Sequence, residues 1–252
     1  MPRVATGESV LSRAVRIIEV FTSSQRDLTV TEISRRAGLH VATTSRLVAE
    51  LVAHGLLARQ ADGRVRVGIR LWELGQRASP TLSLRAAAMP FLEDLHAVVG
   101  HHVQLGVLDG AEVLFVERLS APGAVINFTQ IAGRLPLHVS SSGLVLMAFA
   151  PHELQDRVLA TPLERFTPNT VTDPARLRAI LAGIRRDGHV VTNGYLHTDA
   201  TGIAVAVRDG QGSVVAALSA IVPNDGQAFT RIPVLHASAR GITRGLTNPL
   251  ND

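Results

Sequence analysis

Hydroxyl and guanidinium side chains gather at two places in the first seventy residues. Residues 43–46 read Thr-Thr-Ser-Arg and open a segment with helical periodicity. Arg64 and Arg66 alternate with Val65 and Val67, so we expect both guanidinium groups on one face of a strand and both valines on the other. Small hydroxylated residues and arginine at the leading end of a helix can reach base edges and phosphates in a duplex groove about 12 Å wide. The two places therefore predict contact with a polyanion.

A run of three serines and a glycine, residues 140–143, precedes an apolar segment that we expect to be a buried helix. Free backbone amides at the start of a helix, together with hydroxyl groups, form a site for an anion such as a carboxylate. Ile203 and Val205 share one face of a predicted strand and would supply an apolar wall. The run indicates a small-molecule site, and the alternative is a serine-rich N-cap on an ordinary core helix.

Patterns for catalysis and metal binding are weak. The sequence has no Gly-x-Ser-x-Gly, His-Glu-x-x-His, P-loop or Gly-x-Gly-x-x-Gly fingerprint. Ser141, His138 and Asp199 can be drawn as a triad, but no spacing fixes their geometry. The histidine pair at 101–102, or His138 with His197 and Asp199, is an alternative metal site. We therefore expect no enzyme activity, no catalytic residue, no cofactor and no metal.

Three predicted helices position the hydroxyl-rich run. The first begins after Ser9, which stands where an N-cap belongs. Thr29 and Glu32 have the spacing of a capping box at the start of the second helix. Gly38 is the natural turn between the second helix and a third over residues 41–53, because glycine accepts the left-handed conformation.

A predicted β-hairpin follows the third helix, with Asp62-Gly63 as its turn. Helix, helix–Gly–helix and an arginine-bearing hairpin predict a winged helix-turn-helix domain over residues 9–68 that binds DNA. The alternative is a small helical bundle whose polar faces are only solvated. The candidate DNA contacts are Arg35, Val41, Thr43, Thr44, Ser45, Arg46, Arg64 and Arg66.

A further helix over residues 69–78 carries the only tryptophan, Trp72. Either this side chain packs against a partner or it lies under the wing. The dipeptide at 79–80, Ser-Pro, is the predicted domain boundary, so residues 69–80 form a linker helix.

The rest of the chain, residues 81–250, is predicted to be an antiparallel sheet with helices packed around it. The fold class is therefore α+β. The predicted helices span 90–99, 143–150, 174–186 and 233–246, and the predicted strands span 103–108, 112–119, 124–129, 203–207 and 214–222.

Charge is distributed unevenly along the chain. All 25 basic residues are arginine. Residues 1–80 hold 12 arginines and seven acidic residues, and the remainder holds 13 arginines and 14 acidic residues. A basic first third and a neutral remainder favour a polyanionic partner for the N-terminal part, although a charge of this size also arises by chance.

Length and composition bound the class of protein. The chain has 252 residues, of which 46% are hydrophobic, as expected for one or two packed domains. The absence of cysteine excludes disulfides and thiolate chemistry. Charges interrupt the first nineteen residues, and the longest uncharged stretch, 135–152, is too polar to cross a bilayer. We therefore expect a cytoplasmic protein with no membrane partner.

Several motifs together resemble the IclR family of bacterial transcription regulators. The resemblance covers residues 9–247, with its motifs in the family's order. Its motifs are residues 31–39 (TEISRRAGL) with Thr43 and 46–48 (RLV), residues 67–75 (VGIRLWELG), residues 135–138 (LPLH) with 142–143 (SG), residues 185–188 (RRDG) and residues 202–207 (GIAVAV).

This resemblance implies a winged helix-turn-helix domain followed by a GAF-like α/β effector-binding domain. It further implies a homodimer or a dimer of dimers on a palindromic operator, with operator binding controlled by a small organic or aromatic acid. A repressor and an activator would look alike at this level. Carried over position by position, the effector site would include Ala124, Leu135, Ser141, Ser142, Tyr195, Ile203 and Val205.

The sequence departs from the family pattern at two places near this site. Leu144 stands where the family usually has lysine, and residues 195–199 contain a single acidic residue where the family usually has several. Tyr195 at a position that can carry a carboxylate indicates a larger or more aromatic ligand.

Overall fold

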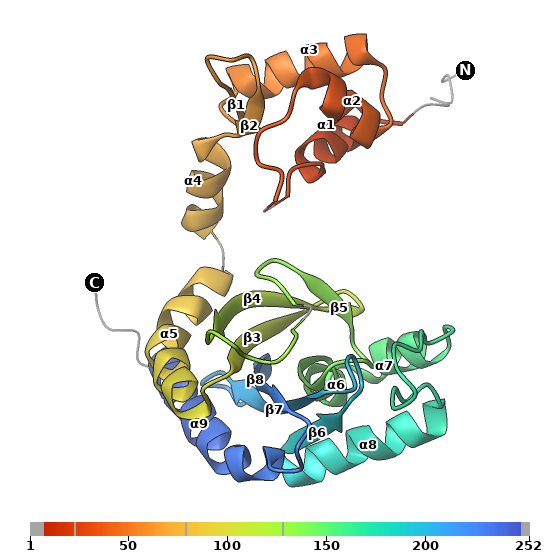
Figure 1. Cartoon of the computed structure of the whole chain (residues 1–252), viewed down its shortest axis with the longest axis vertical. Helices are drawn as coiled ribbons and strands as arrows, with labels where there is room; N and C mark the ends of the chain where they lie inside the picture. Colours follow the sequence, from red (N-terminus) through yellow and green to blue (C-terminus); the bar gives the residue numbers. More distant parts are fainter. Residues whose placement is uncertain (1–7, 23, 79, 128, 248–252) are drawn as a thin grey trace. The chain divides into compact units, whose positions relative to one another are not determined.

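The computed structural model describes residues 8–22, 24–78, 80–127 and 129–247 (Figure 1). The chain forms two compact units that divide between residues 79 and 80. Ser79, in the predicted boundary dipeptide, and residues 248–250, at the end of the predicted second domain, lie outside the described residues. No helix in the described ranges is long and apolar enough to cross a membrane.

The first unit contains helices and a two-stranded hairpin. Its elements are α1 (Val10–Glu19), α2 (Val30–Ala37), α3 (Val41–Ala53), β1 (Leu57–Arg59), β2 (Val65–Val67) and α4 (Ile69–Ala78). Ser9 caps α1, and Thr29 and Glu32 form the predicted capping box of α2. Gly38 turns the chain toward α3 with a φ of 62°. Local sequence signals thus set these helix boundaries.

The core of the first unit decides which side chains of α3 face outward. Leu47 and Val48 of α3 are buried against α1 and α2. Val65 of β2 closes this core, because its backbone pairs with Leu28. Val67 is 43% exposed. Alternation along β2 places Val65 and Val67 on the same face, as predicted, but the core reaches only as far as Val65.

The second unit is a six-stranded antiparallel sheet between two layers of helices (Figure 1). The strand order is β5-β4-β3-β8-β7-β6. Helices α5 and α9 cover one face, and α6, α7 and α8 cover the other. Its elements are α5 (Pro80–Val99), β3 (His102–Asp109), β4 (Glu112–Ser120), β5 (Arg134–Pro136), α6 (Ser141–Phe149), α7 (His152–Leu159), α8 (Pro174–Asp187), β6 (His189–Asn193), β7 (Ala200–Arg208), β8 (Val214–Pro223), the 3-10 turn η1 (Ala228–Arg231) and α9 (Ile232–Thr247).

The α+β class is confirmed, and five elements differ from prediction. Helix α5 begins ten residues earlier than expected, because Leu84 and Ala88 extend its buried stripe past an exposed Pro90. The described residues of the predicted strand 124–129, which exclude Phe128, form a loop. Strands β5 and β6 and helix α7 were not predicted, since short or mixed segments give no clear period.

Candidate ligand pocket and nucleic-acid interface

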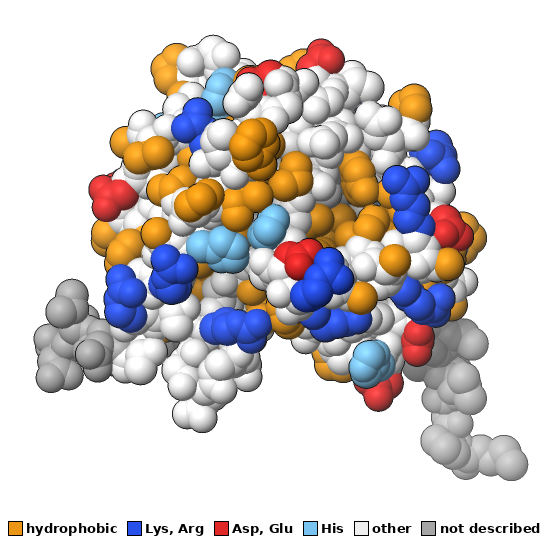
Figure 2. Space-filling view, turned by 90° about the horizontal axis from the view of Figure 1, so that it is seen from below, with side chains coloured by type: hydrophobic (Ala, Val, Ile, Leu, Met, Phe, Trp, Pro, Cys, Tyr) orange, Lys and Arg blue, Asp and Glu red, His pale blue; other side chains and the backbone are white. Residues whose placement is uncertain are grey.

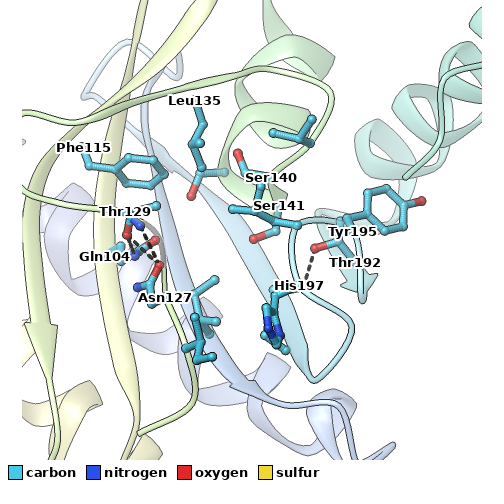
Figure 3. A pocket seen from close by; sticks show the side chains of 17 residues that line it. Gln104, Phe115, Asn127, Thr129, Leu135, Ser140, Ser141, Thr192, Tyr195 and His197 are labelled. Carbon is cyan, nitrogen blue, oxygen red and sulfur yellow. Dashed lines mark hydrogen bonds between the residues drawn. The ribbon is translucent and has the colours of Figure 1, made fainter. Parts of the chain in front are cut away.

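A small cavity lies where the start of α6 meets the sheet (Figure 3). Its volume is about 40 Å³, which is room for about three water molecules. Phe115, Leu135 and Val139 supply apolar lining. The polar residues that line it are Gln104, Asn127, Thr129, Ser140, Ser141, Ser142, Thr192, Tyr195 and His197.

The three serines at the start of α6 have different roles. Ser140 is the N-cap, and its hydroxyl accepts a hydrogen bond from the Gly143 amide at 3.0 Å. The Ser142 hydroxyl donates to Ser219 at 2.8 Å. The Ser141 hydroxyl is buried and has no hydrogen-bond partner among the described residues. A buried unpaired hydroxyl is costly, so Ser141 is the serine of the three that is available to a ligand.

A chain of hydrogen bonds along one wall of the cavity fixes Asn127 (Figure 3). The Gln104 amide donates to the Thr129 hydroxyl, which in turn donates to Asn127 Oδ1 at 2.8 Å. Asn127 Oδ1 also accepts from the Thr129 backbone amide at 3.0 Å. Asn127 Nδ2 is buried, and no partner for it occurs within the part of the chain that the structure describes. This wall therefore contains a buried hydrogen-bond donor that is not satisfied within the described residues.

The loop that carries Asn127 is anchored by His102. His102 Nε2 donates to the Val125 carbonyl at 2.6 Å, because a carbonyl only accepts. His102 Nδ1 then accepts from the Ser120 hydroxyl at 2.9 Å, and the same hydroxyl oxygen accepts from Arg118 Nε at 2.9 Å. Burial lowers the pKa of His102, and the Arg118 charge adds to this shift. The neutral imidazole thus holds the loop in place.

Four of the predicted effector residues, Leu135, Ser141, Ser142 and Tyr195, line the cavity. The phenol of Tyr195 points away from the other labelled side chains in Figure 3. Its pKa is raised by burial, so the phenol stays neutral at physiological pH.

The predicted apolar wall of Ile203 and Val205 is wrong. Both side chains are fully buried on the opposite face of the sheet, against α5 and α9. Side chains alternate along β7, so Gly202 faces the cavity instead. The prediction for Ala124 is also wrong: its loop contributes Ile126 and Asn127 to the lining, and Ala124 does not line the cavity.

Sequence reasoning missed Gln104, Asn127, Thr129 and Thr192 as lining residues, and it considered His197 only as a metal ligand. The signal for two of them was present, since Gln104 and Thr192 are polar residues in otherwise apolar strands and are buried. Asn127 and Thr129 gave no signal, because they lie in an irregular loop whose position depends on His102.

The start of α3 is exposed in the first unit. Thr44 is the exception among the predicted contacts: its side chain is buried, and its hydroxyl donates to the His40 carbonyl at 3.1 Å. The prediction that Thr44 lies on the outward face is therefore wrong, because helical spacing turns it to the core with Leu47 and Val48. The remaining predicted helix residues are fully or partly exposed: Arg35, Val41, Thr43, Ser45 and Arg46.

The electrostatics of α3 favour an anion at its start. The first turn contains no acidic residue, and the N-cap His40 makes no side-chain capping bond. The positive end of the helix is therefore neither neutralised nor covered within this unit. Such a helix end suits a DNA phosphate.

Asp27 tethers both wing arginines. Arg66 Nε donates to its carboxylate at 3.0 Å, and Arg64 Nη1 donates to its backbone carbonyl at 3.1 Å. Arg64 also lies 3.9 Å from Glu32 and 3.8 Å from Asp62. Both guanidinium groups remain about half exposed. Asp27, which sequence reasoning missed, therefore orients the guanidinium groups of Arg64 and Arg66 and leaves them accessible to solvent.

The alternative metal and triad residues have other roles. Both ring nitrogens of His102 make hydrogen bonds, and His138 Nε2 donates to the Glu164 carbonyl at 2.8 Å. Across the described ranges, no group of three or more His, Asp or Glu side chains is placed to hold a metal ion.

A winged helix-turn-helix joined to a sheet domain with a small pocket that holds buried polar groups defines a ligand-responsive transcription regulator. Residues 10–61 match the IclR helix-turn-helix domain, and residues 76–241 match the bacterial transcriptional regulator IclR C-terminal domain. The chain belongs to the IclR family of bacterial transcriptional regulators, and the GAF-like fold of the second unit fits that family.

Named relatives agree with a regulatory function. The HTH-type transcriptional regulator XynR of Escherichia coli (strain K12) is 30% identical over 211 residues, which cover 83% of this chain and 84% of XynR. The HTH-type transcriptional repressor AllR of the same organism is 29% identical over 225 residues, covering 88% and 83%. The crystal structure of an IclR homolog from Microbacterium hydrocarbonoxydans, complexed with 4-hydroxybenzoate, is 47% identical with a TM-score of 0.90 and covers 94% of this chain and 99% of that one.

Proposed function

We propose that this regulator responds to a hydroxylated aromatic monocarboxylate that binds in the cavity at the start of α6. The observation that carries the proposal is the buried, unpaired hydroxyl of Ser141 at a helix N-terminus. The amides of the first turn and this hydroxyl suit a carboxylate. Asn127 Nδ2 suits a hydroxyl oxygen at the other end of the ligand, and Phe115 and Leu135 suit the ring.

A similar protein binds a ligand of this class. The homolog from Microbacterium hydrocarbonoxydans is complexed with 4-hydroxybenzoate. Because the cavity here is only about 40 Å³, an aromatic acid enters only when part of the lining moves. The segment 195–197 is half-buried and connects β6 to β7 without secondary structure, so it is the part that we expect to move.

Calorimetric titration of the full chain tests this proposal. We expect 4-hydroxybenzoate to bind more tightly than benzoate, and both more tightly than succinate. Ser141→Ala should weaken 4-hydroxybenzoate binding about tenfold or more, because a hydrogen bond to a charged group is lost. It should not lower the unfolding temperature, because the hydroxyl is unpaired without ligand.

Ser238→Ala is the matched control, since Ser238 is a buried serine of α9 that does not line the cavity. Equal affinity of the wild type and Ser141→Ala for 4-hydroxybenzoate, or tighter binding of succinate, would contradict the proposed ligand class.

For the DNA partner, we propose that the exposed residues of α2, α3 and the wing contact a palindromic operator. Serine, threonine and arginine at the start of α3 suit base edges in the major groove, and the wing arginines suit phosphates. Thr44 contributes to the fold of α3 instead. The proposed contacts are Arg35, Val41, Thr43, Ser45, Arg46, Arg64 and Arg66.

A second copy of the chain is the proposed partner of the first unit. Leu11 of α1 is 73% exposed, and Ile69 and Trp72 of α4 are 71% and 61% exposed. Ile69 and Trp72 are three residues apart and share a face of α4, and a contiguous exposed apolar patch marks an interaction surface. A homodimer with twofold symmetry matches a palindrome, and a dimer of dimers would occupy two such sites. Because the partner is DNA, the proposed place of action is the cytoplasm.

The proposed control is a change in how paired first units are spaced, transmitted through α4. The effector must bind the two arrangements with different affinities, since otherwise it shifts no equilibrium.

A further inference from the structure

A second hollow lies in the sheet unit, at the opposite end of α6 and β7 from the ligand cavity. It is a groove of about 420 Å³. Figure 2 shows arginine and histidine side chains gathered beside an apolar hollow on one face of the molecule. The residues that define the groove are Phe149, Ala206, Arg208, His236, Arg240 and Arg244.

The arginines of this groove form no ion pair with a carboxylate of the described residues. In the described part of the chain, no carboxylate pairs with Arg208, Arg240 or Arg244, and no acidic residue lines the groove. The two nearest acidic residues in sequence are engaged elsewhere. Asp187 forms a two-bond pair with Arg186, and the Asp209 carboxylate accepts from backbone amides of its own turn.

The groove also has an apolar floor and a fixed orientation of one arginine. The Arg208 guanidinium lies 4.7 Å from the centre of the Phe149 ring, and its Nη1 donates to the Gly212 carbonyl at 2.7 Å. His236 packs edge-on against His189 with 5.9 Å between ring centres. Burial lowers the pKa of His236, and the charges of His189 and Arg240 lower it further. Only the smaller part of this pKa shift comes from the positive charges around the ring.

We propose that this groove binds a phosphate monoester carried on an apolar or aromatic group, as a second small-molecule site that goes beyond the proposed effector function. Guanidinium groups match phosphate oxygens in pairs. A phosphate monoester carries a charge of about −1.5 to −2 at pH 7, which fits three arginines better than a single carboxylate does. Phe149, Ala206 and Ala239 receive the apolar part, and the volume lies in the range of small-molecule sites.

Titration calorimetry with phenyl phosphate at constant ionic strength tests the proposal on the full-length protein. We expect one phenyl phosphate per chain, competition by inorganic phosphate and no binding of phenol. Arg240→Gln combined with Arg244→Gln should weaken binding by about tenfold or more, because two charge-assisted contacts are lost. Both arginines are exposed, so the fold should be retained.

Arg157→Gln, on the exposed face of α7, is the control with the same type of charge loss, and it should bind phenyl phosphate like the wild type. Ser141→Ala should also leave this binding unchanged, which separates the groove from the effector cavity. Nuclear magnetic resonance of the His236 ring should show its pKa rise on binding, since an anion offsets the surrounding charge.

Three results would overturn the proposal. The first is no binding at millimolar phenyl phosphate. The second is an equal loss of affinity in Arg157→Gln, which would indicate general charge attraction. The third is displacement of phenyl phosphate by a DNA duplex of unrelated sequence, which would assign the arginines to a nucleic-acid backbone.

Discussion

Gly202 of β7 lies directly against Ser141 of α6. A Cβ atom at residue 202 would stand 2.7 Å from the Ser141 hydroxyl oxygen and 2.7 Å from the Thr192 hydroxyl oxygen. Carbon atoms do not approach oxygen atoms so closely without displacement. Because Gly202 has no side chain, there is room for the Ser141 hydroxyl at the cavity wall. That hydroxyl is buried and has no hydrogen-bond partner among the described residues.

Replacing Gly202 with alanine should disturb the cavity before it disturbs the fold. The added methyl group pushes Ser141 away, so we expect 4-hydroxybenzoate affinity to fall by about tenfold or more and the free energy of unfolding to fall by about 1–3 kcal/mol. Calorimetry and urea unfolding measure the two effects.

Gly183→Ala is the control in the same unit. Its added Cβ would meet nothing closer than 3.9 Å, and it lies within α8. Alanine favours a helix over glycine by up to about 1 kcal/mol, so this variant should be at least as stable as the wild type. If Gly202→Ala binds the acid normally, the role assigned to this glycine is wrong.

His102 predicts a loss of stability in mild acid. Its pKa lies below the ordinary value of 6.5 in the folded protein because the ring is buried. The unfolded chain therefore takes up a proton first as the pH falls. The neutral His102 ring stabilises the folded protein fully above about pH 6.5, and this stabilisation is lost as the pH falls through the pKa of the folded state.

Urea unfolding between pH 8 and pH 5 measures this effect. We expect the free energy of unfolding to decline below about pH 6.5, and His102→Gln to decline less steeply. His236 also has a lowered pKa and contributes to the same decline. The control is His152→Gln, an exposed position at the start of α7. If His102→Gln and the wild type showed the same pH dependence of the free energy of unfolding, His102 would not be the source of the decline.

Arg46 should be needed for specific DNA binding and not for folding. It is exposed on α3 and, in the described residues, makes no hydrogen bond or ion pair within the chain. For Arg46→Ala we expect an unchanged unfolding temperature and a loss of about 1–3 kcal/mol in operator binding if the guanidinium reads a base.

Fluorescence anisotropy with the operator and with a scrambled duplex distinguishes two roles of Arg46. A loss confined to the operator indicates base contact, and an equal loss on both duplexes with a smaller salt dependence indicates phosphate contact. Arg157→Ala, outside the first unit, is the control. No loss on either duplex would contradict DNA contact by α3.

Trp72 should contribute to self-association. An exposed tryptophan of α4 that packs against a second copy loses a large contact area on truncation. We expect Trp72→Ala to raise the dimer dissociation constant by about tenfold or more while each chain stays folded. Light scattering across a concentration series measures this, with Phe229→Ala as a control at an exposed aromatic position outside α4. An unchanged oligomeric state would remove α4 from the interface.

The parts of the fold predicted best are those determined by neighbouring residues. The capping box at Thr29, the left-handed turn at Gly38 and the end of α8 at Gly188 each depend on a few adjacent positions. The face of β7 could not be predicted in the same way. Alternation places Ile203 and Val205 together, but only the packing of α5 and α9 decides which side of the sheet they face.

The cavity could be predicted only where its residues belong to a local sequence pattern. The run of serines at residues 140–142 predicts the start of a helix, and Ser141 lines the cavity. The wall opposite comes from Gln104 and Asn127, which are joined through Thr129 by hydrogen bonds between distant segments. The loop that carries Asn127 and Thr129 is bonded to His102 through the Val125 carbonyl, and no local pattern in residues 124–129 could reveal these contacts.

Helix α6 is used at both ends. Its first turn borders the cavity, and Phe149 at its last position lies beneath Arg208 in the groove. The nine residues between these ends span about 14 Å, and the middle of the helix is buried on every side. Because the helix is buried, it cannot shift toward solvent. We therefore expect a displacement of the serines at its start to move Phe149 or to change the packing around Met147. A substitution at Met147 should therefore weaken the coupling between the cavity and the groove, although Met147 lines neither of them.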